Sequence, residues 1–372
     1  MSIHNLLRSW EPLSHFSEDQ LGQLVRCLAR NRYPAGASVL QEGDPTLDAY
    51  LVASGNVRIQ RQTPYGIFNL AVLGPGELFG ETSFVDHEAR SGDALTLTET
   101  ELLTLNPVAA AATLERDQRF AVALYWTFWK SLAQKLRDTN HKLTHFFPES
   151  SRPAASGPLE VPDASGAMAS FRVDLADKRK LFQEQRLSAM EINFLSSLSK
   201  EKKLATNQVL FREGEPGSEM YVVLDGRVMI SKYIPGAGEE ALAFLERGDW
   251  FGEMALIDNQ PRSADAKAHD GGAVVLAIPR EVVEGLLDMR KVSSLRLLKI
   301  LCGLVAKRLR DLDDKIVGWH ILAGGGGAES CLGTLNSTRN FVLAHGRTLY
   351  SEEQARPHPL TLSEGINGSK LQ

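Results

Sequence analysis

Two short segments of the chain combine a glycine, a carboxylate and a guanidinium at the same spacing. Residues 251–264 read Phe-Gly-Glu-Met-Ala-Leu-Ile-Asp-Asn-Gln-Pro-Arg-Ser-Ala, and residues 79–92 read Phe-Gly-Glu-Thr-Ser-Phe-Val-Asp-His-Glu-Ala-Arg-Ser-Gly. In both segments the arginine follows the glutamate by nine residues. A guanidinium donates hydrogen bonds in a fork that fits a phosphate, whereas a carboxylate only accepts them. The pattern, which we call a cassette, predicts a site for a small anion such as a sugar phosphate, and predicts it twice.

The cassettes belong to a longer internal repeat. Helix-capping boxes begin at Ser17 and Ser188, and each is followed by short runs of β-forming residues separated by glycines. The interval from Ser17 to Ser188 is almost the same as the interval from Arg90 to Arg262. A repeat unit that takes up nearly half of the chain is a duplicated domain, because solenoid repeats span roughly 20 to 50 residues. We predict an α+β fold of two tandem antiparallel β-rolls, similar to double-stranded jelly rolls and each flanked by helices.

Domain boundaries follow from changes in composition and periodicity. We predict a first domain at residues 6–143, a linker rich in Pro, Ala and Ser at 144–176, a second domain at 177–317, and a glycine-rich, disordered tail at 318–372 with one strand at 340–344.

Each domain ends in a helical pattern with one apolar stripe. Apolar residues recur at three- and four-residue steps across residues 119–143 and 294–317. Such stripes need an apolar partner. We predict that the two helices pair, either within one chain as a pseudo-dimer or between two chains as a homodimer.

Composition excludes several classes of function. The net charge of −5 at pH 7 gives no broad cationic field for nucleic acid. Residues 295–309 are amphipathic, so no membrane insertion is predicted, and residues 1–10 show no secretory signal pattern. The three cysteines are too widely spaced for a disulfide framework or a metal site. No nucleophile-base pair or nucleotide triphosphate loop is recognisable. We expect a cytoplasmic, non-enzymatic protein with no metal and no cofactor.

The cassettes, with the glycine-punctuated strands before them, resemble tandem cyclic-nucleotide-binding domains of the catabolite activator protein and cAMP-dependent protein kinase regulatory subunit type. The resemblance covers residues 6–143 and 177–317. It implies that the arginine binds the cyclic phosphate, that the glutamate accepts the ribose 2'-hydroxyl, and that the helix after the cassette packs over the base. The ligand-binding residues that it implies are Phe251, Gly252, Glu253, Met254, Ala255, Pro261, Arg262, Ser263 and Ala264 in the second domain, and Gly80, Glu81, Thr82, Ser83, Arg90 and Ser91 in the first.

The first cassette departs from the family pattern. Ala89 and Gly92 replace the Pro and Ala of the second cassette, and Glu88 adds a negative charge close to the expected phosphate. A loop without proline costs more to order on binding, and a nearby carboxylate weakens anion affinity. Whether the first domain binds a ligand therefore stays open, and the second domain carries the clearer pattern.

The residue after the arginine leaves the choice of nucleotide undecided. A hydroxyl at the position of Ser263 is associated with cGMP preference in eukaryotic members of the family, whereas bacterial cAMP receptors also carry Ser there. We favour cAMP over cGMP as the ligand, and the sequence does not separate either from cyclic di-GMP.

The predicted function is a cyclic-nucleotide receptor that transmits binding allosterically to an unidentified protein effector. A transcription regulator of the catabolite activator type would need a basic recognition helix, which the glycine-rich tail does not show. A kinase regulatory subunit would need a pseudosubstrate with clustered arginines, and residues 147–170 contain only Arg152. A scaffold with degenerate pockets is the remaining alternative, and it would bind no ligand.

Overall fold

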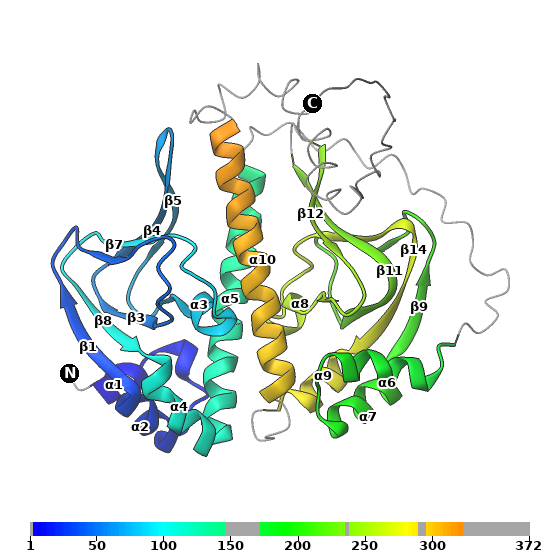
Figure 1. Ribbon diagram of the computed structural model, residues 1–372, viewed down its shortest axis with the longest axis horizontal. Coiled ribbons are helices and arrows are strands. Elements are labelled where there is room, and N and C mark those ends of the chain that lie inside the picture. The colour runs from blue at the N-terminus through cyan, green and yellow to red at the C-terminus, as the bar shows by residue number, and fades with distance from the viewer. Residues whose placement is uncertain (1–2, 146–171, 235–237, 289–294, 323–372) are drawn as a thin grey trace, which may run out of the picture.

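The fold consists of two β-rolls on either side of a pair of long helices (Figure 1). The computed structural model describes residues 3–145, 172–234, 238–288 and 295–322. The predicted strand at 340–344 lies outside the described residues, as do most of the predicted linker and tail. Within the described ranges, no helix combines the length and the apolarity needed to cross a membrane.

The first domain opens with short helices, continues as a roll and closes with a long helix. The opening elements are α1 (Ile3–Arg8), a 3₁₀ turn (Glu11–Leu13) and α2 (Glu18–Cys27). The roll contains β1 (Leu28–Tyr33), β2 (Ser38–Leu40), β3 (Ala49–Ser54), β4 (Val57–Thr63), β5 (Gly66–Leu73), β6 (Leu78–Phe79), α3 (Glu81–Asp86), β7 (Asp93–Thr96) and β8 (Thr100–Leu105). The closing helices are α4 (Pro107–Arg116) and α5 (Gln118–His145).

The second domain repeats this order. It contains α6 (Leu175–Glu184), α7 (Ala189–Leu198), β9 (Lys200–Leu204), β10 (Val209–Phe211), β11 (Glu219–Ile234), β12 (Gly238–Leu245), β13 (Trp250–Phe251), α8 (Met254–Ile257), β14 (Asp265–Pro279), α9 (Arg280–Leu286) and α10 (Leu295–Leu322). The predicted capping boxes are confirmed at α2 and α7, where the serine side chain and the residue three positions later bond reciprocally to backbone amides.

All strand pairs of both rolls are antiparallel, which confirms the predicted fold class. The first roll has two four-stranded sheets, in the orders β1-β8-β3-β6 and β2-β7-β4-β5. In the second roll β11 spans the counterparts of β3 and β4, and β14 spans those of β7 and β8. A six-stranded sheet therefore replaces the two smaller ones, and both rolls enclose an apolar core.

The long helices α5 and α10 lie side by side between the rolls (Figure 1). Their apolar stripes are buried against each other and the rolls, with Leu132, Leu298 and Leu301 each 0% exposed. The thiol of Cys302 donates to the carbonyl of Tyr125 across this contact, at 3.2 Å. The pairing predicted for residues 119–143 and 294–317 is thus present within one chain, and the homodimer stays a prediction.

Three helix ends differ by a few residues from the predicted domain boundaries, which stay predictions. Helix α5 extends to His145 and α6 begins at Leu175, so both ends of the predicted linker are helical. Helix α10 continues to Leu322, past the predicted start of the tail. The helix extends beyond residue 317 because its apolar contacts also extend there. Val317 is buried, and Trp319 packs against the core.

Candidate ligand-binding sites

The first cassette forms one wall of a cavity of about 530 Å³. Residues of α5 and α10 contribute the facing wall, so the cavity lies between the roll and the helix pair. Sites for small organic ligands usually measure roughly 300 to 1,000 Å³, so the cavity has a suitable size. All six residues predicted for this domain line it, namely Gly80, Glu81, Thr82, Ser83, Arg90 and Ser91.

Arg90 is fixed in the cavity wall by its own domain. Its Nε donates to Thr46 Oγ1 at 3.1 Å, its Nη1 to the Gly80 carbonyl at 3.0 Å, and its Nη2 to the Asp48 carbonyl at 2.8 Å. Burial lowers the pKa of Arg90, yet an arginine stays protonated in proteins. The cavity therefore has a permanent cation whose orientation is set before any ligand arrives.

The glycine of each cassette is required by this arrangement. Gly80 has a φ of 75°, and a Cβ added there would lie 2.7 Å from the Asp48 carbonyl oxygen and 2.8 Å from Arg90 Nη1. Gly252 has a φ of 77°, and its Cβ would lie 2.7 Å from Arg262 Nη1. Only glycine combines a left-handed backbone with so close an approach at low cost.

Glu81 has one oxygen engaged and one unengaged. The residue is 0% exposed, and its Oε1 accepts from Ser131 Oγ at 2.8 Å and from Lys135 Nζ at 2.5 Å, both on α5. No donor among the described residues reaches Glu81 Oε2. Buried polar atoms nearly always have a hydrogen-bond partner, so Oε2 is suited to accept a bond from a ligand hydroxyl.

The second cassette holds its arginine in the same way. Arg262 donates through Nη1 to the Gly252 carbonyl and through Nη2 to the Glu219 carbonyl, each at 2.6 Å. Its guanidinium also lies over the Phe211 ring, 4.2 Å from the ring centroid. Gly217 stands where the first domain has Thr46, so no hydroxyl is present there, and Arg262 Nε has no acceptor within the described ranges. The Nε–H of this arginine is therefore unengaged among the described residues.

Glu253 repeats the pattern of Glu81 with a different cation. It is 2% exposed, and its Oε1 accepts from Arg308 Nη1 of α10 at 2.8 Å. Arg308 also donates to the Trp250 carbonyl. Glu253 Oε2, like Glu81 Oε2, lacks a donor in the part of the chain that the structure describes. Both carboxylates are therefore anchored by the long helix of their own domain.

The second cavity is much smaller, at about 80 Å³. Eight of the nine residues predicted for it line it, namely Phe251, Gly252, Glu253, Met254, Ala255, Arg262, Ser263 and Ala264. The difference in volume has a local cause, because three lining residues are larger than their counterparts in the first cavity. Phe211, Met254 and Leu312 stand where the first cavity has Leu40, Thr82 and Thr139.

Two predicted features lie outside the cavities. Pro261 does not line the second one, and its carbonyl instead accepts from Arg137 of α5 at 3.0 Å. Glu88 is exposed and does not line the first one, and whether its charge weakens anion binding stays a prediction. Glu88 lies outside because of the turn after α3, where His87 adopts a left-handed conformation and Glu88 N donates to Asp86 Oδ1.

Each cavity is completed by the long helix of the other domain, which the cassette motif does not indicate. Leu309, Arg310 and Asp313 of α10 line the first cavity, and Leu136 and Asn140 of α5 line the second. One signal could have revealed them. The interval from Leu136 to Leu309 equals the interval from Asn140 to Asp313, so the repeat places equivalent residues at equivalent positions.

Asp313 is a partly buried carboxylate with no hydrogen-bond partner among the described residues. It lines the first cavity, and no hydrogen bond or ion pair joins its carboxylate to another described residue. Burial raises the pKa of Asp313 to about 7, with a smaller contribution from Asp314, against the opposing charges of Arg61, Lys142 and Lys135. The carboxyl group is therefore partly protonated near neutral pH.

Asp313 makes stability depend on pH. Because its pKa in the folded state exceeds the value of about 3.9 in an unfolded chain, the folded state binds more protons between about pH 4 and 7, and the free energy of unfolding falls as pH rises through that window. We expect Asp313→Asn to remove this fall and to stabilise the protein by about 1 to 2 kcal/mol at pH 8, less than the full shift because the side chain is partly exposed.

Urea unfolding of the wild type and Asp313→Asn at pH 5 and pH 8 measures this difference. Asp225→Asn is the control, since Asp225 is exposed and lies in the second roll. If Asp313→Asn raised the free energy of unfolding equally at both pH values, the pH dependence of stability would not come from Asp313.

The comparisons with known proteins agree with the geometry. The family model of the cyclic nucleotide-binding domain matches the chain twice, at residues 30–117 and 201–290. The chain is similar to the cGMP-dependent protein kinase egl-4 of Caenorhabditis elegans, with 23% identity over 280 residues, which cover 75% of this chain and 29% of the kinase. It is 42% identical to the cyclic AMP receptor protein of Thermus thermophilus over 96 residues, which cover 25% of this chain and 44% of the receptor.

Among solved structures, the N-terminal domain of a transcriptional regulator from Streptomyces coelicolor A3(2) is 33% identical, with coverage of 37% of this chain and 95% of that domain and a TM-score of 0.31. The chain spans less than half the length of the two curated relatives named above. The matches to the family model contain both cassettes, which lie at residues 79–92 and 251–264. The chain therefore belongs to the cyclic nucleotide-binding domain family, with one copy of the domain in each half.

Proposed function

We propose that the chain is a non-enzymatic receptor for a cyclic purine nucleotide, and that the cavity of the first domain is its principal site. One observation carries the proposal. A fixed guanidinium, Arg90, and an unengaged carboxylate oxygen, Glu81 Oε2, line one cavity of about 530 Å³. A cyclic phosphate needs the first group and a ribose 2'-hydroxyl needs the second.

The second domain has the same polar groups in a smaller space. Arg262 Nε and Glu253 Oε2 lack partners among the described residues, so the chemistry for a nucleotide is present. The cavity of about 80 Å³ must open before a nucleotide fits. Opening moves Met254 and Leu312, which costs free energy, so we propose that the second site has the lower affinity.

The residues supplied by the other domain offer polar groups to a base but do not select one. Asn140 lines the second cavity, and its buried Oδ1 has no donor within the described ranges. An amide can pair with the amino group and N1 of adenine, and equally with O6 and N1–H of guanine. Asp313, at the equivalent position of the first cavity, offers a donor and an acceptor only when it is protonated. We favour cAMP over cGMP because the relative with 42% identity is a cyclic AMP receptor protein.

The helix pair is the proposed route to a protein effector. A ligand changes the output only if it binds one arrangement of the helices more tightly than another. Lys135 of α5 contacts Glu81 and Arg308 of α10 contacts Glu253, so a ligand bound to Glu81 acts directly on α5 and one bound to Glu253 acts directly on α10. We also propose a cytoplasmic location, for which the free thiols of Cys27 and Cys302 give support.

Isothermal titration calorimetry with cAMP, cGMP and cyclic di-GMP tests the proposal. We expect the wild type to bind cAMP most tightly, and Arg90→Ala to weaken the tighter site about a hundredfold, because the buried phosphate loses its cation. Arg262→Ala is the matched control, since it removes the equivalent cation from the other domain and leaves the tighter site intact. Absence of heat and of any thermal shift with all three nucleotides at millimolar concentration would favour the scaffold without ligand.

A further inference from the structure

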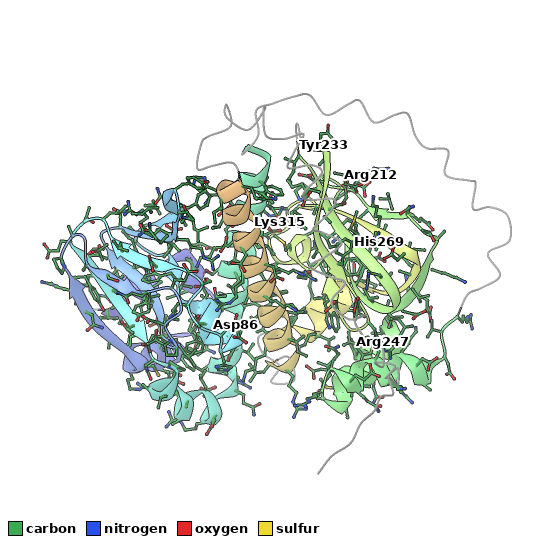
Figure 2. All side chains as sticks on the ribbon, turned by 45° about the horizontal axis from the view of Figure 1, so that its top comes forward. Asp86, Arg212, Tyr233, Arg247, His269 and Lys315 are labelled. Carbon is green, nitrogen blue, oxygen red and sulfur yellow. The ribbon has the colours of Figure 1, made fainter. Side chains whose placement is uncertain are left out.

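In each cassette, an aspartate side chain and a backbone carbonyl accept hydrogen bonds from an arginine of the other half of the chain. Arg310 of α10 donates from Nε to Asp86 Oδ2 at 2.6 Å and from Nη2 to Asp86 Oδ1 at 3.1 Å. Its Nη1 donates to the Ala89 carbonyl at 2.8 Å, and its Nη2 also reaches Ser83 Oγ at 3.1 Å. Figure 2 shows Asp86 beside α10. All four bonds join the second domain's helix to the first domain's cassette.

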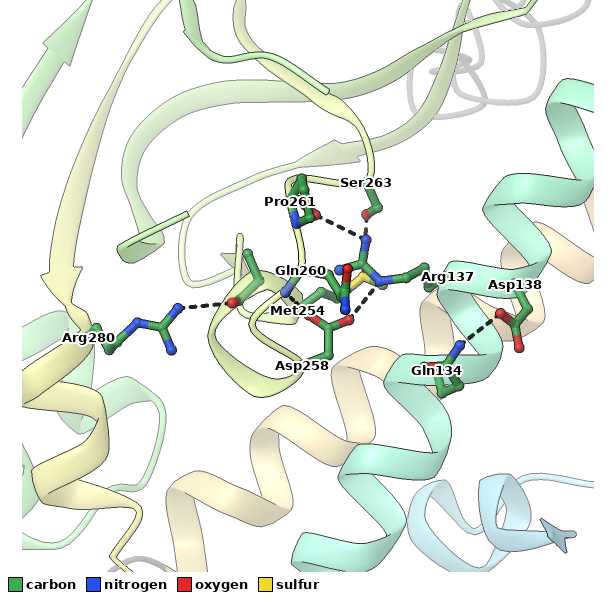
Figure 3. A network of polar contacts seen from close by, with 10 residues as sticks. Gln134, Arg137, Asp138, Met254, Asp258, Gln260, Pro261, Ser263 and Arg280 are labelled. Atoms are coloured by element: carbon green, nitrogen blue, oxygen red, sulfur yellow. Dashed lines mark hydrogen bonds and ion pairs between the residues drawn. The ribbon is translucent and has the colours of Figure 1, made fainter. Parts of the chain in front are cut away.

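The reciprocal contact is present on the other side. Arg137 of α5 donates from Nε to Asp258 Oδ2 at 2.6 Å and from Nη1 to the Pro261 carbonyl at 3.0 Å (Figure 3). The side chains of Arg137 and Asp258 are 10% and 17% exposed, which excludes most solvent from the pair. Such a bond between two charged groups is stronger than one between neutral groups.

The two contacts are equivalent under the internal repeat. The interval from Arg137 to Arg310 equals the interval from Leu136 to Leu309 on the same two helices. Asp86 and Asp258 are separated by the same interval as the cassette arginines, and so are the accepting carbonyls of residues 89 and 261. Two independent surface contacts would not be expected to coincide in this way. The equivalence indicates that the crossed arginines belong to the architecture of the helix pair.

The crossed arginines hold the part of the cassette that positions the phosphate-binding arginine. The carbonyl that Arg310 binds belongs to Ala89, the residue before Arg90, and the carbonyl that Arg137 binds belongs to Pro261, the residue before Arg262. The aspartates end or follow the short cassette helices, α3 and α8. An arginine that fixes both ends of this loop restricts where the cation next to it can lie.

Each long helix therefore contacts both cassettes. On α5, Lys135 binds Glu81 of its own domain and Arg137, two residues later, binds Asp258 of the other. On α10, Arg308 binds Glu253 of its own domain and Arg310, two residues later, binds Asp86 of the other. Residues two apart on a helix point about 200° from each other, so one helix bridges the two sites.

We propose that Arg310 and Arg137 are positioning residues, each of which completes the phosphate-binding loop of the other domain, so that the affinity of one site depends on the docking of the other domain's helix. The proposal rests on the proposed function for its ligand and on the described contacts for its geometry. It follows that a ligand bound to one cassette favours the helix position in which the crossed arginine contacts the phosphate-binding loop of the other cassette.

The test measures the first site alone. In an Arg262→Ala background, which disables the second site, we expect Arg310→Met to weaken cAMP binding at the first site about tenfold in calorimetry at 10 °C. Arg310→Lys should recover part of the loss, since it restores the charge opposite Asp86 without the fork to the Ala89 carbonyl. Arg296→Met, an exposed arginine on the same helix, is the control and should bind like the background.

A second measurement needs no nucleotide. Hydrogen exchange of residues 86–91 should become faster in Arg310→Met than in Arg296→Met, because the loop has lost the hydrogen bonds from Arg310. If cAMP binds the background protein and Arg310→Met binds it equally well, the positioning role is wrong, even if the melting temperature falls. If no cyclic nucleotide binds the wild type, the proposed function fails, whereas unchanged exchange of residues 86–91 overturns the inference by itself.

Discussion

We expect the replacement of Arg308 by methionine to lower the free energy of unfolding by about 3 to 5 kcal/mol. Arg308 is the described partner of Glu253, which is 2% exposed and whose second oxygen has no donor among the described residues. The substitution keeps most of the aliphatic stem and removes the charge, so it leaves a carboxylate buried without compensation. It also removes a donor from the Trp250 carbonyl. Urea unfolding followed by circular dichroism measures the loss.

The first domain provides a matched control for this prediction. Lys135→Met removes the equivalent cation, but Glu81 keeps the hydrogen bond from Ser131 Oγ at 2.8 Å, so we expect a smaller loss. Adding Glu253→Gln to Arg308→Met should recover part of the stability, because the buried group is then neutral. A loss below about 1 kcal/mol for Arg308→Met, or an equal loss for Lys135→Met, would show that Glu253 is not held by this ion pair.

We expect that exchanging two residues between the cavities will move the tighter site from the first domain to the second. Thr82→Met with Thr139→Leu places in the first cavity the side chains that reduce the volume of the second cavity. We expect this double substitution to weaken nucleotide binding at the first site more than a hundredfold, because the added side chains occupy the volume the ligand needs. Thr82→Ser with Thr139→Ser keeps the side chains small and should leave the affinity within a few fold.

The converse change should open the second site. Met254→Thr with Leu312→Thr removes buried apolar volume, which costs stability of about 2 to 5 kcal/mol for such large-to-small changes, so binding is measured by calorimetry at low temperature. We expect binding at the second site to become tighter than in the wild type. If the filled first site still binds nucleotide as the wild type does, the cavity of about 530 Å³ is not the place where the ligand lies.

The sequence predicted those features that depend on local chemistry. The capping boxes at Ser17 and Ser188 were recognisable because their bonds close within four residues. The long helices were recognisable from one apolar stripe each. By contrast, the residues of β1 and β9 are largely charged and show no alternation, so the sequence does not indicate strands there. Strands of this kind form because a neighbouring strand offers backbone partners, here β8 and β14.

The residues of the candidate sites were predictable from the sequence, but the volume of each cavity depends on tertiary packing. Of the 15 residues predicted to bind a ligand, 14 line the two cavities, all except Pro261, and their contact with a ligand stays a prediction. The relative size of the two cavities was not predictable from the motif, because the larger side chains that fill the second cavity include Phe211 and Leu312, which lie outside the cassette. The cassette alone favoured the second domain, whereas the volumes favour the first.

The pairing of α5 with α10 inside one polypeptide has an evolutionary consequence. Two identical subunits that associate through a symmetry axis must present the same side chain at both equivalent places. Here Asp313 faces one cavity and Asn140 the other, so a substitution can alter one half and spare its twin. Covalent connection also makes the association independent of dilution, since the halves meet as an intramolecular event. The two copies of the domain can therefore diverge in sequence while they remain paired.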